Sequence, residues 1–80
     1  MAFAFTVASV DQTIFEGDVY SVTLPGVSGE LTVMANHMPF ISTLKKGEVK
    51  IRTGRNADLK TVPIRGGLLE VANNSVIVLV

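Results

Sequence analysis

The stretch GEVKIRT, residues 47–53, decides the fold class of this chain. Val49 and Ile51 alternate with three charged residues, so every second side chain is apolar. Successive side chains of a β-strand point to opposite faces of a sheet. The stretch is therefore predicted to be a strand with one face in a core and the other in water.

The same alternation occurs twice nearer the N-terminus. In FAFTVAS, residues 3–9, the two phenylalanines and Val7 share one face. VYSVTL, residues 19–24, predicts a strand in which Tyr20, Val22 and Leu24 lie opposite Val19, Ser21 and Thr23. Val, Ile, Phe and Thr fit the pleated surface of a sheet, so composition and pattern both indicate β structure.

Turn-forming residues interrupt the apolar runs at short, regular intervals. The predicted turns are EGD (16–18), PGVSG (25–29), KKG (45–47), TGRNAD (53–58), RGG (65–67) and ANNS (72–75). Short strands at this spacing predict one all-β domain over residues 1–80, an antiparallel sandwich or small barrel.

Several turn residues carry a specific expectation. Gly26 after Pro25 suits the third position of a type II turn, which requires a positive φ. Gly66 and Gly67 predict a sharp bend or a close backbone approach. Pro63 cannot donate to a ladder, which predicts an edge strand or a bulge.

The C-terminal run SVIVLV, residues 75–80, is apolar on both faces. Such a strand is expected to be central in its sheet or covered on both sides. We expect natural relatives to continue beyond Val80.

Composition bounds the function. The 80 residues are 48% hydrophobic and 18% charged, with seven basic and seven acidic side chains and no cysteine. Zero net charge argues against nucleic acid or an anionic membrane as the main partner, because both select for a basic face. No segment approaches the roughly 20 apolar residues of a membrane span, and residues 1–12 lack the pattern of a signal peptide.

An enzyme is not expected. His37 is the only histidine, so it alone would serve as the base of a serine triad, and no GxSxG or GxxxxGK[ST] motif is present. Glu30, Asp58 and Glu70 lie in separate turns or strands without the spacing of metal ligands. We therefore expect no catalytic residue, no metal site and no cofactor.

The stretch HMPFISTL, residues 37–44, leaves two interpretations open. Pro39 argues against a regular strand or an interior helix. The segment is then either a crossover with its own apolar plug or a loop that presents Met, His and Phe to a partner.

An ordered set of motifs resembles the epsilon subunit of F-type ATP synthases, called delta in mitochondria. LPGVSGELTVMANHMPFISTLKKGEVKI, followed by GGLLEVANNSVIVL, carries the resemblance, which extends from Phe3 to Val80. The matching positions are Pro25, Gly26, Gly29, Glu30, His37, Pro39, Leu44, Gly47, Gly66, Gly67, Glu70, Val71 and Asn74. Residues 32–37 depart from the family pattern, and asparagine at position 36 is able to hold a left-handed conformation before the histidine.

The resemblance implies a two-layer β-sandwich of about ten short strands in the central stalk of the rotary motor. The family's domain rests on the c-ring and binds the gamma subunit, without chemistry of its own, and helps couple proton flow to ATP synthesis. It is peripheral to the membrane, on the cytoplasmic face of the bacterial inner membrane or the stromal face of the thylakoid.

The resemblance also implies site residues. Glu30 and Ser28 are expected on the c-ring side. His37, Met38, Phe40 and Thr43 are expected on the gamma side. Pro25, Gly26, Gly29, Gly66 and Gly67 are expected as structural turns.

Family members usually continue into an inhibitory helical hairpin, and this sequence stops where that hairpin would begin. It is expected to be either a naturally short protein or an N-terminal domain, with neither inhibition of hydrolysis nor ATP binding. An apolar patch near residues 76–80 or 38–44 is expected, with weak self-association of the isolated chain. The alternative is a free-standing β-sandwich that binds a protein or carbohydrate.

Overall fold

The computed structural model describes residues 2–80, which form nine β-strands and no helix. The strands are β1 (Phe3–Ala8), β2 (Thr13–Val19), β3 (Ser21–Gly26), β4 (Gly29–Met34), β5 (Phe40–Leu44), β6 (Gly47–Arg52), β7 (Leu59–Ile64), β8 (Gly67–Ala72) and β9 (Ser75–Leu79). The prediction of an all-β fold is confirmed, with nine strands instead of about ten. No helix in this part of the chain is long and apolar enough to cross a membrane.

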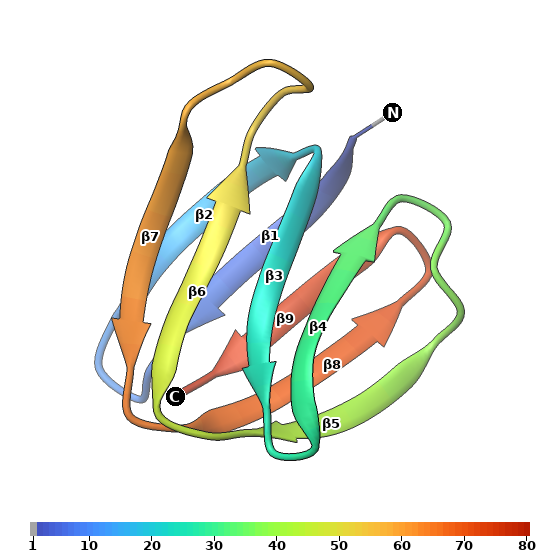
Figure 1. Ribbon diagram of the computed structural model, residues 1–80. Coiled ribbons are helices and arrows are strands. Elements are labelled where there is room, and N and C mark those ends of the chain that lie inside the picture. Colours follow the sequence, from blue (N-terminus) through green and yellow to red (C-terminus); the bar gives the residue numbers. More distant parts are fainter. Residues whose placement is uncertain (1) are drawn as a thin grey trace.

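The strands form one curled sheet that folds over into two layers (Figure 1). β4, β3, β6 and β7 make the front layer, and β2, β1, β9, β8 and β5 make the back layer. The layers join where Gly26 of β3 pairs with Leu44 of β5. The predicted sandwich is thus built from a continuous ladder that changes layer at one corner.

The core lies between the layers and is entirely apolar. Among residues 2–80 no polar or charged side chain is buried. Val49 and Ile51 of GEVKIRT are fully buried, as their alternation predicted. The buried set is Phe3, Phe5, Val7, Val19, Val22, Leu24, Val33, Leu44, Val49, Ile51, Ile64, Leu69, Val71, Val76 and Val78. Burial of these side chains is the main favourable term for a domain this small.

The predicted placements of the C-terminal run and of Pro63 are both confirmed. β9 is a central strand that pairs in parallel with β1 and antiparallel with β8. β7, which contains Pro63, ends the sheet and pairs only with β6. A missing N–H is tolerated at Pro63 because one side of an edge strand has no neighbour.

Two predicted local boundaries are wrong. EGD, predicted as a turn, lies inside β2, where Gly17 pairs with Phe5. VYSVTL is not one strand, because β2 ends at Val19 and β3 begins at Ser21. Both Val19 and Val22 are fully buried, so the inward phase changes across Tyr20. In a single regular strand, residues three apart point to opposite faces, so Val19 and Val22 would not share the inward face.

The predicted turn PGVSG is shorter in the structure. Pro25 and Gly26 close β3, Gly29 opens β4, and the turn itself is residues 27–28. Gly29 has the positive φ, +136°, that was expected at Gly26. A Cβ at Gly26 would instead lie 2.7 Å from the Gly29 carbonyl oxygen, so Gly26 permits close packing of the hairpin.

The remaining turn predictions hold. Gly66 has φ +145°, and a Cβ at Gly67 would lie 2.4 Å from the Leu79 carbonyl oxygen. Residues 65–66 therefore bend the chain, and Gly67 lets the start of β8 approach β9 closely. Asn36 has φ 65°, as expected for asparagine before the histidine.

Candidate functional site

The candidate contact residues lie at two ends of β4. The hairpin end of the sandwich carries the β3–β4, β5–β6 and β7–β8 connections, residues 27–28, 45–46 and 65–66 (Figure 1). The 35–39 loop leaves the opposite end of β4. Because a strand of six residues spans roughly 20 Å, the length of β4 separates Ser28 from His37.

The hairpin end is fixed by backbone hydrogen bonds. The Val27 N–H donates to the Thr43 carbonyl at 3.1 Å, and the Lys45 N–H donates to the Pro25 carbonyl at 2.8 Å. Ser28 is exposed at the tip of this tied-down turn. A contact made by Ser28 would therefore rest on a rigid support.

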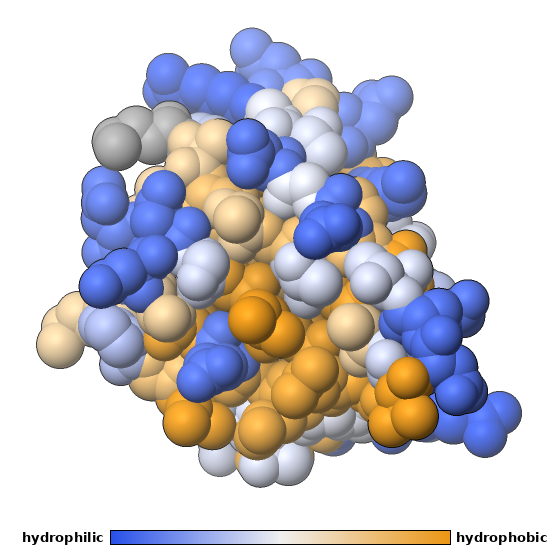
Figure 2. All heavy atoms as spheres, turned by 180° about the vertical axis from the view of Figure 1, so that it is seen from behind, coloured by the Kyte–Doolittle hydropathy of each residue, from blue (hydrophilic) through white to orange (hydrophobic). Residues whose placement is uncertain are grey.

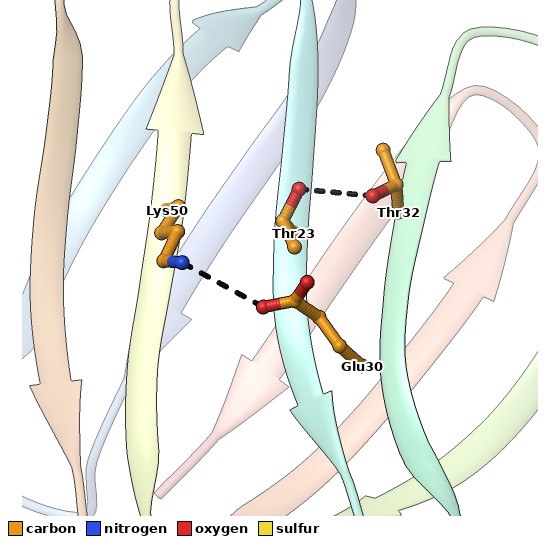
Figure 3. A network of polar contacts seen from close by, with 4 residues as sticks. All are labelled: Thr23, Glu30, Thr32 and Lys50. Atoms are coloured by element: carbon orange, nitrogen blue, oxygen red, sulfur yellow. Dashed lines mark hydrogen bonds and ion pairs between the residues drawn. The ribbon is translucent and has the colours of Figure 1, made fainter.

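Glu30 lies on the outer face of the front layer, not at the turn itself. Its Oε2 is 3.6 Å from Nζ of Lys50, across β3 (Figure 3). The side chains of Glu30 and Lys50 are 64% and 40% exposed, so this pair is solvated and weak. Thr23 and Thr32 share a hydrogen bond of 3.0 Å beside it, which gives this face a polar character.

His37 is exposed and held by local contacts. Its Nδ1 donates to the Met38 carbonyl at 3.0 Å. Its ring lies 5.0 Å from the ring of Phe40, at an angle of 53°. Residues 2–80 contain no group of three or more His, Asp or Glu side chains placed to hold a metal ion.

The other predicted gamma-side residues do not all lie with His37. Met38 is 78% exposed and extends the 35–39 loop surface. Phe40 is half-buried and packs against the core. Thr43 lies at the far end of β5, where its carbonyl binds the turn that carries Ser28. The structure thus brings Thr43 to the hairpin end and away from His37.

The segment HMPFISTL supplies apolar side chains to the core, while its contact with a partner stays a prediction. Contrary to the expectation drawn from Pro39, residues 40–44 form the regular strand β5, because Pro39 precedes the first ladder residue. Phe40 and Leu44 turn to the core, while Met38 and Ile41 are exposed. The segment therefore anchors itself inward and presents apolar side chains outward.

An exposed apolar patch covers the outer face of the back layer. It consists of Ile41, Leu68, Ile77 and Leu79, which are 66%, 41%, 37% and 52% exposed. Leu68 pairs with Leu79, while Glu70 lies between Ile41 and Ile77. Figure 2, a view from behind, shows hydrophobic side chains gathered in its lower half. The expected patch is present and joins the two segments named for it.

A feature that sequence reasoning missed is the segregation of charge. All seven Lys and Arg residues lie within residues 45–65, together with only two acidic residues, which makes this segment +5. The other residues carry five carboxylates and no Lys or Arg, so they sum to −5. The zero net charge conceals this division, and counting charge by segment would have found it.

Comparisons with known proteins agree with the observed fold. The model of the family described as "ATP synthase, Delta/Epsilon chain, beta-sandwich domain" matches residues 2–80. An ATP synthase epsilon chain from Herminiimonas arsenicoxydans is 40% identical over 91% of this chain and 52% of its own length. One from Caulobacter vibrioides is 35% identical over 94% of this chain and 85% of its own length.

A solved structure shows the same fold at lower identity. A chain of the Euglena gracilis mitochondrial ATP synthase superposes with a TM-score of 0.89 and 21% identity, over 98% of this chain and 49% of that one. The chain spans about half the length of the first curated relatives that it matches, at 52% and 53%. On the family model and these identities, residues 2–80 belong to the β-sandwich domain family of ATP synthase delta and epsilon chains.

Proposed function

We propose that this chain is a non-catalytic part of the central stalk of an F-type ATP synthase. In this role it links the gamma subunit to the c-ring and helps couple proton transport to ATP synthesis. The observation that carries the proposal is the family match over residues 2–80. The related Euglena structure includes the c-ring, and a second structural relative, from Tetrahymena thermophila, is a central stalk with its c-ring.

The two contacts are proposed at the two ends of β4. Ser28 and Glu30 meet the c-ring, while His37, Met38 and Phe40 meet the gamma subunit. Their separation by a strand of roughly 20 Å supports a bridging role. Thr43, predicted for the gamma side, lies beside the turn of Ser28 instead, so we assign it to the c-ring end of the bridge.

The rigidity of the sandwich supports transmission of torque. Connections of two residues join β3 to β4, β5 to β6, β7 to β8 and β8 to β9. Each is flanked by a ladder pair or a buried residue. Ser28 lies on one of these short connections, so a contact that it makes moves with the whole body, as a rotor component requires.

Membership of this complex would place the chain at a membrane without crossing it. We propose peripheral association through the c-ring, on the cytoplasmic face of a bacterial inner membrane or the stromal face of a thylakoid. The family match does not favour the alternative of a free-standing protein- or carbohydrate-binding module.

Size-exclusion chromatography with purified gamma subunit from the same source tests the proposal. A one-to-one complex is expected, and His37→Ala is expected to weaken it. The proposal would be contradicted if neither gamma alone nor gamma with the c-ring captured the chain at tens of micromolar. Such a result corresponds to a binding free energy weaker than about −6 kcal/mol.

A further inference from the structure

The cations of residues 45–65 divide into those with a partner inside the chain and those without. Lys50 pairs with Glu30, Arg52 donates to the Ala57 carbonyl at 2.7 Å, and Lys60 lies 5.3 Å from the Phe15 ring. Within residues 2–80 no such contact is found for the side chains of Lys45, Lys46, Arg55 and Arg65. Three of these four belong to the hairpin end.

A recess lies between two of the unpartnered cations. It measures about 540 Å³ and is lined by Lys46, Gly47, Glu48, Pro63, Ile64 and Arg65. Gly47 pairs with Ile64 and Glu48 pairs with Pro63, so the recess covers the first rungs of the β6–β7 ladder. Its lining combines the apolar Pro63 and Ile64 with the charged side chains of Lys46, Glu48 and Arg65.

Both cations of the lining follow closely after a buried residue in the chain. Arg65 follows the buried Ile64, and Lys46 lies two residues after the buried Leu44. A Cβ at Gly47 would lie 2.9 Å from Cβ of Pro25, so this corner is tightly packed. The backbone positions of Lys46 and Arg65 are therefore set by the sandwich before any partner arrives.

We propose that this recess receives the carboxylate of an acidic side chain from the partner protein at the hairpin end. The inference rests on the proposed function, which assigns that end to the c-ring. The recess lining carries two cations and Glu48, a net charge of +1 that one carboxylate neutralises. Pro63 and Ile64 of the lining offer apolar contact to the methylene stem of the incoming glutamate or aspartate.

A protein carboxylate fits the recess better than lipid headgroups do. Binding to anionic lipid ordinarily uses clusters of about four to eight Lys or Arg residues. It also uses aromatic or large apolar side chains that enter the headgroup region. The lining offers two cations beside a carboxylate and no aromatic residue. A concave site with this charge recognises one acidic side chain.

Carbodiimide cross-linking of the whole chain to a complex of gamma and c-ring from the same source tests the proposal. The reagent joins the Lys46 Nζ to a carboxylate carbon as an amide, with the carbodiimide leaving as its urea. Mass spectrometry is expected to identify Lys46 bonded to an Asp or Glu of the partner. Lys46→Arg keeps the charge and lacks the amine, so it is expected to bind equally and form no such product.

A binding comparison complements the cross-link. The double variant K46Q/R65Q is expected to weaken capture by about tenfold, with a reduced dependence on salt. The control, Arg55→Gln, removes an equally unpartnered cation from the 53–58 loop at the other end of β6 and is expected to bind as the parent does. Circular dichroism verifies that all variants are folded.

The possible failures are distinguishable. No capture of the parent chain contradicts the proposed function itself. Capture of the parent and of K46Q/R65Q with equal affinity overturns only the recess assignment. A third outcome is that the parent binds vesicles of phosphatidylcholine and phosphatidylglycerol, that K46Q/R65Q does not, and that Lys46 forms no cross-link to protein. This outcome would show that the recess binds lipid and not a protein carboxylate.

Discussion

The two layers of this sandwich share one core but differ on their outer faces. The front layer presents the Glu30–Lys50 pair and the Thr23–Thr32 hydrogen bond to solvent. The back layer presents an apolar patch that includes Ile41 and Leu79. The inner faces, which are equally buried, determine the fold. The outer faces take no part in this core and are free to differ, and an exposed apolar patch is typical of a contact surface.

Truncation of the core is expected to have the largest effect, and it tests whether the layers share that core. Leu24 of the front layer and Leu69 of the back layer are both fully buried. Leu24→Ala and Leu69→Ala are each expected to lower the free energy of unfolding by about 2–5 kcal/mol, measured by urea denaturation. A cost near zero for one of them would show that its layer is not packed on a common core.

Gly67, where the start of β8 closely approaches the end of β9, is expected to be the next most sensitive position. In Gly67→Ala the new methyl group meets the Leu79 backbone at 2.4 Å, which costs about 1–3 kcal/mol of stability. Gly54→Ala is the control, because its Cβ would lie at an ordinary 3.7 Å from Ala57. That variant is expected to change stability by less than about 0.5 kcal/mol. Equal thermal midpoints for the two variants would contradict the close approach.

A matched pair of surface variants compares the outer faces directly. Ile41→Lys places a charge on the apolar patch, and Met34→Lys does the same on the front layer, where Met34 is 46% exposed. Sedimentation velocity at increasing concentration is expected to show weak self-association of the parent chain, abolished only by Ile41→Lys. Self-association that survives Ile41→Lys would remove the patch as its cause.

The ion pair on the front layer is expected to have the smallest effect. A double-mutant cycle with Glu30→Gln and Lys50→Gln is expected to give a coupling energy below about 1 kcal/mol, because both side chains are solvated. The coupling should fall further at high salt. A larger, salt-independent value would mean that the pair is desolvated.

Periodicity predicted the layers of this fold well and its local boundaries less well. Val49 and Ile51 are buried as expected because an alternating strand has only one way to bury an apolar face. The change of phase across Tyr20 was missed, since a short run does not reveal where one strand ends and the next begins. The EGD turn was wrong because pairing of Gly17 with Phe5, a long-range contact, overrides local turn preference.

The resemblance named the candidate contact residues, whose roles stay predictions, but it did not reveal how the fold groups them. Sequence places Thr43 six residues from His37, while the path of β5 carries it to the turn of Ser28. The recess of Lys46 and Arg65 joins two turns that are far apart in sequence. Only the pairing of β6 with β7 brings them together.

Site-specific photo-cross-linking in the assembled ATP synthase of the source organism tests the bridging role most directly. A benzophenone side chain is introduced at Ser28 in one variant and at His37 in another. The proposal predicts that position 28 captures a c-ring subunit and position 37 captures gamma. Capture of the same subunit from both positions would contradict a bridge between the two.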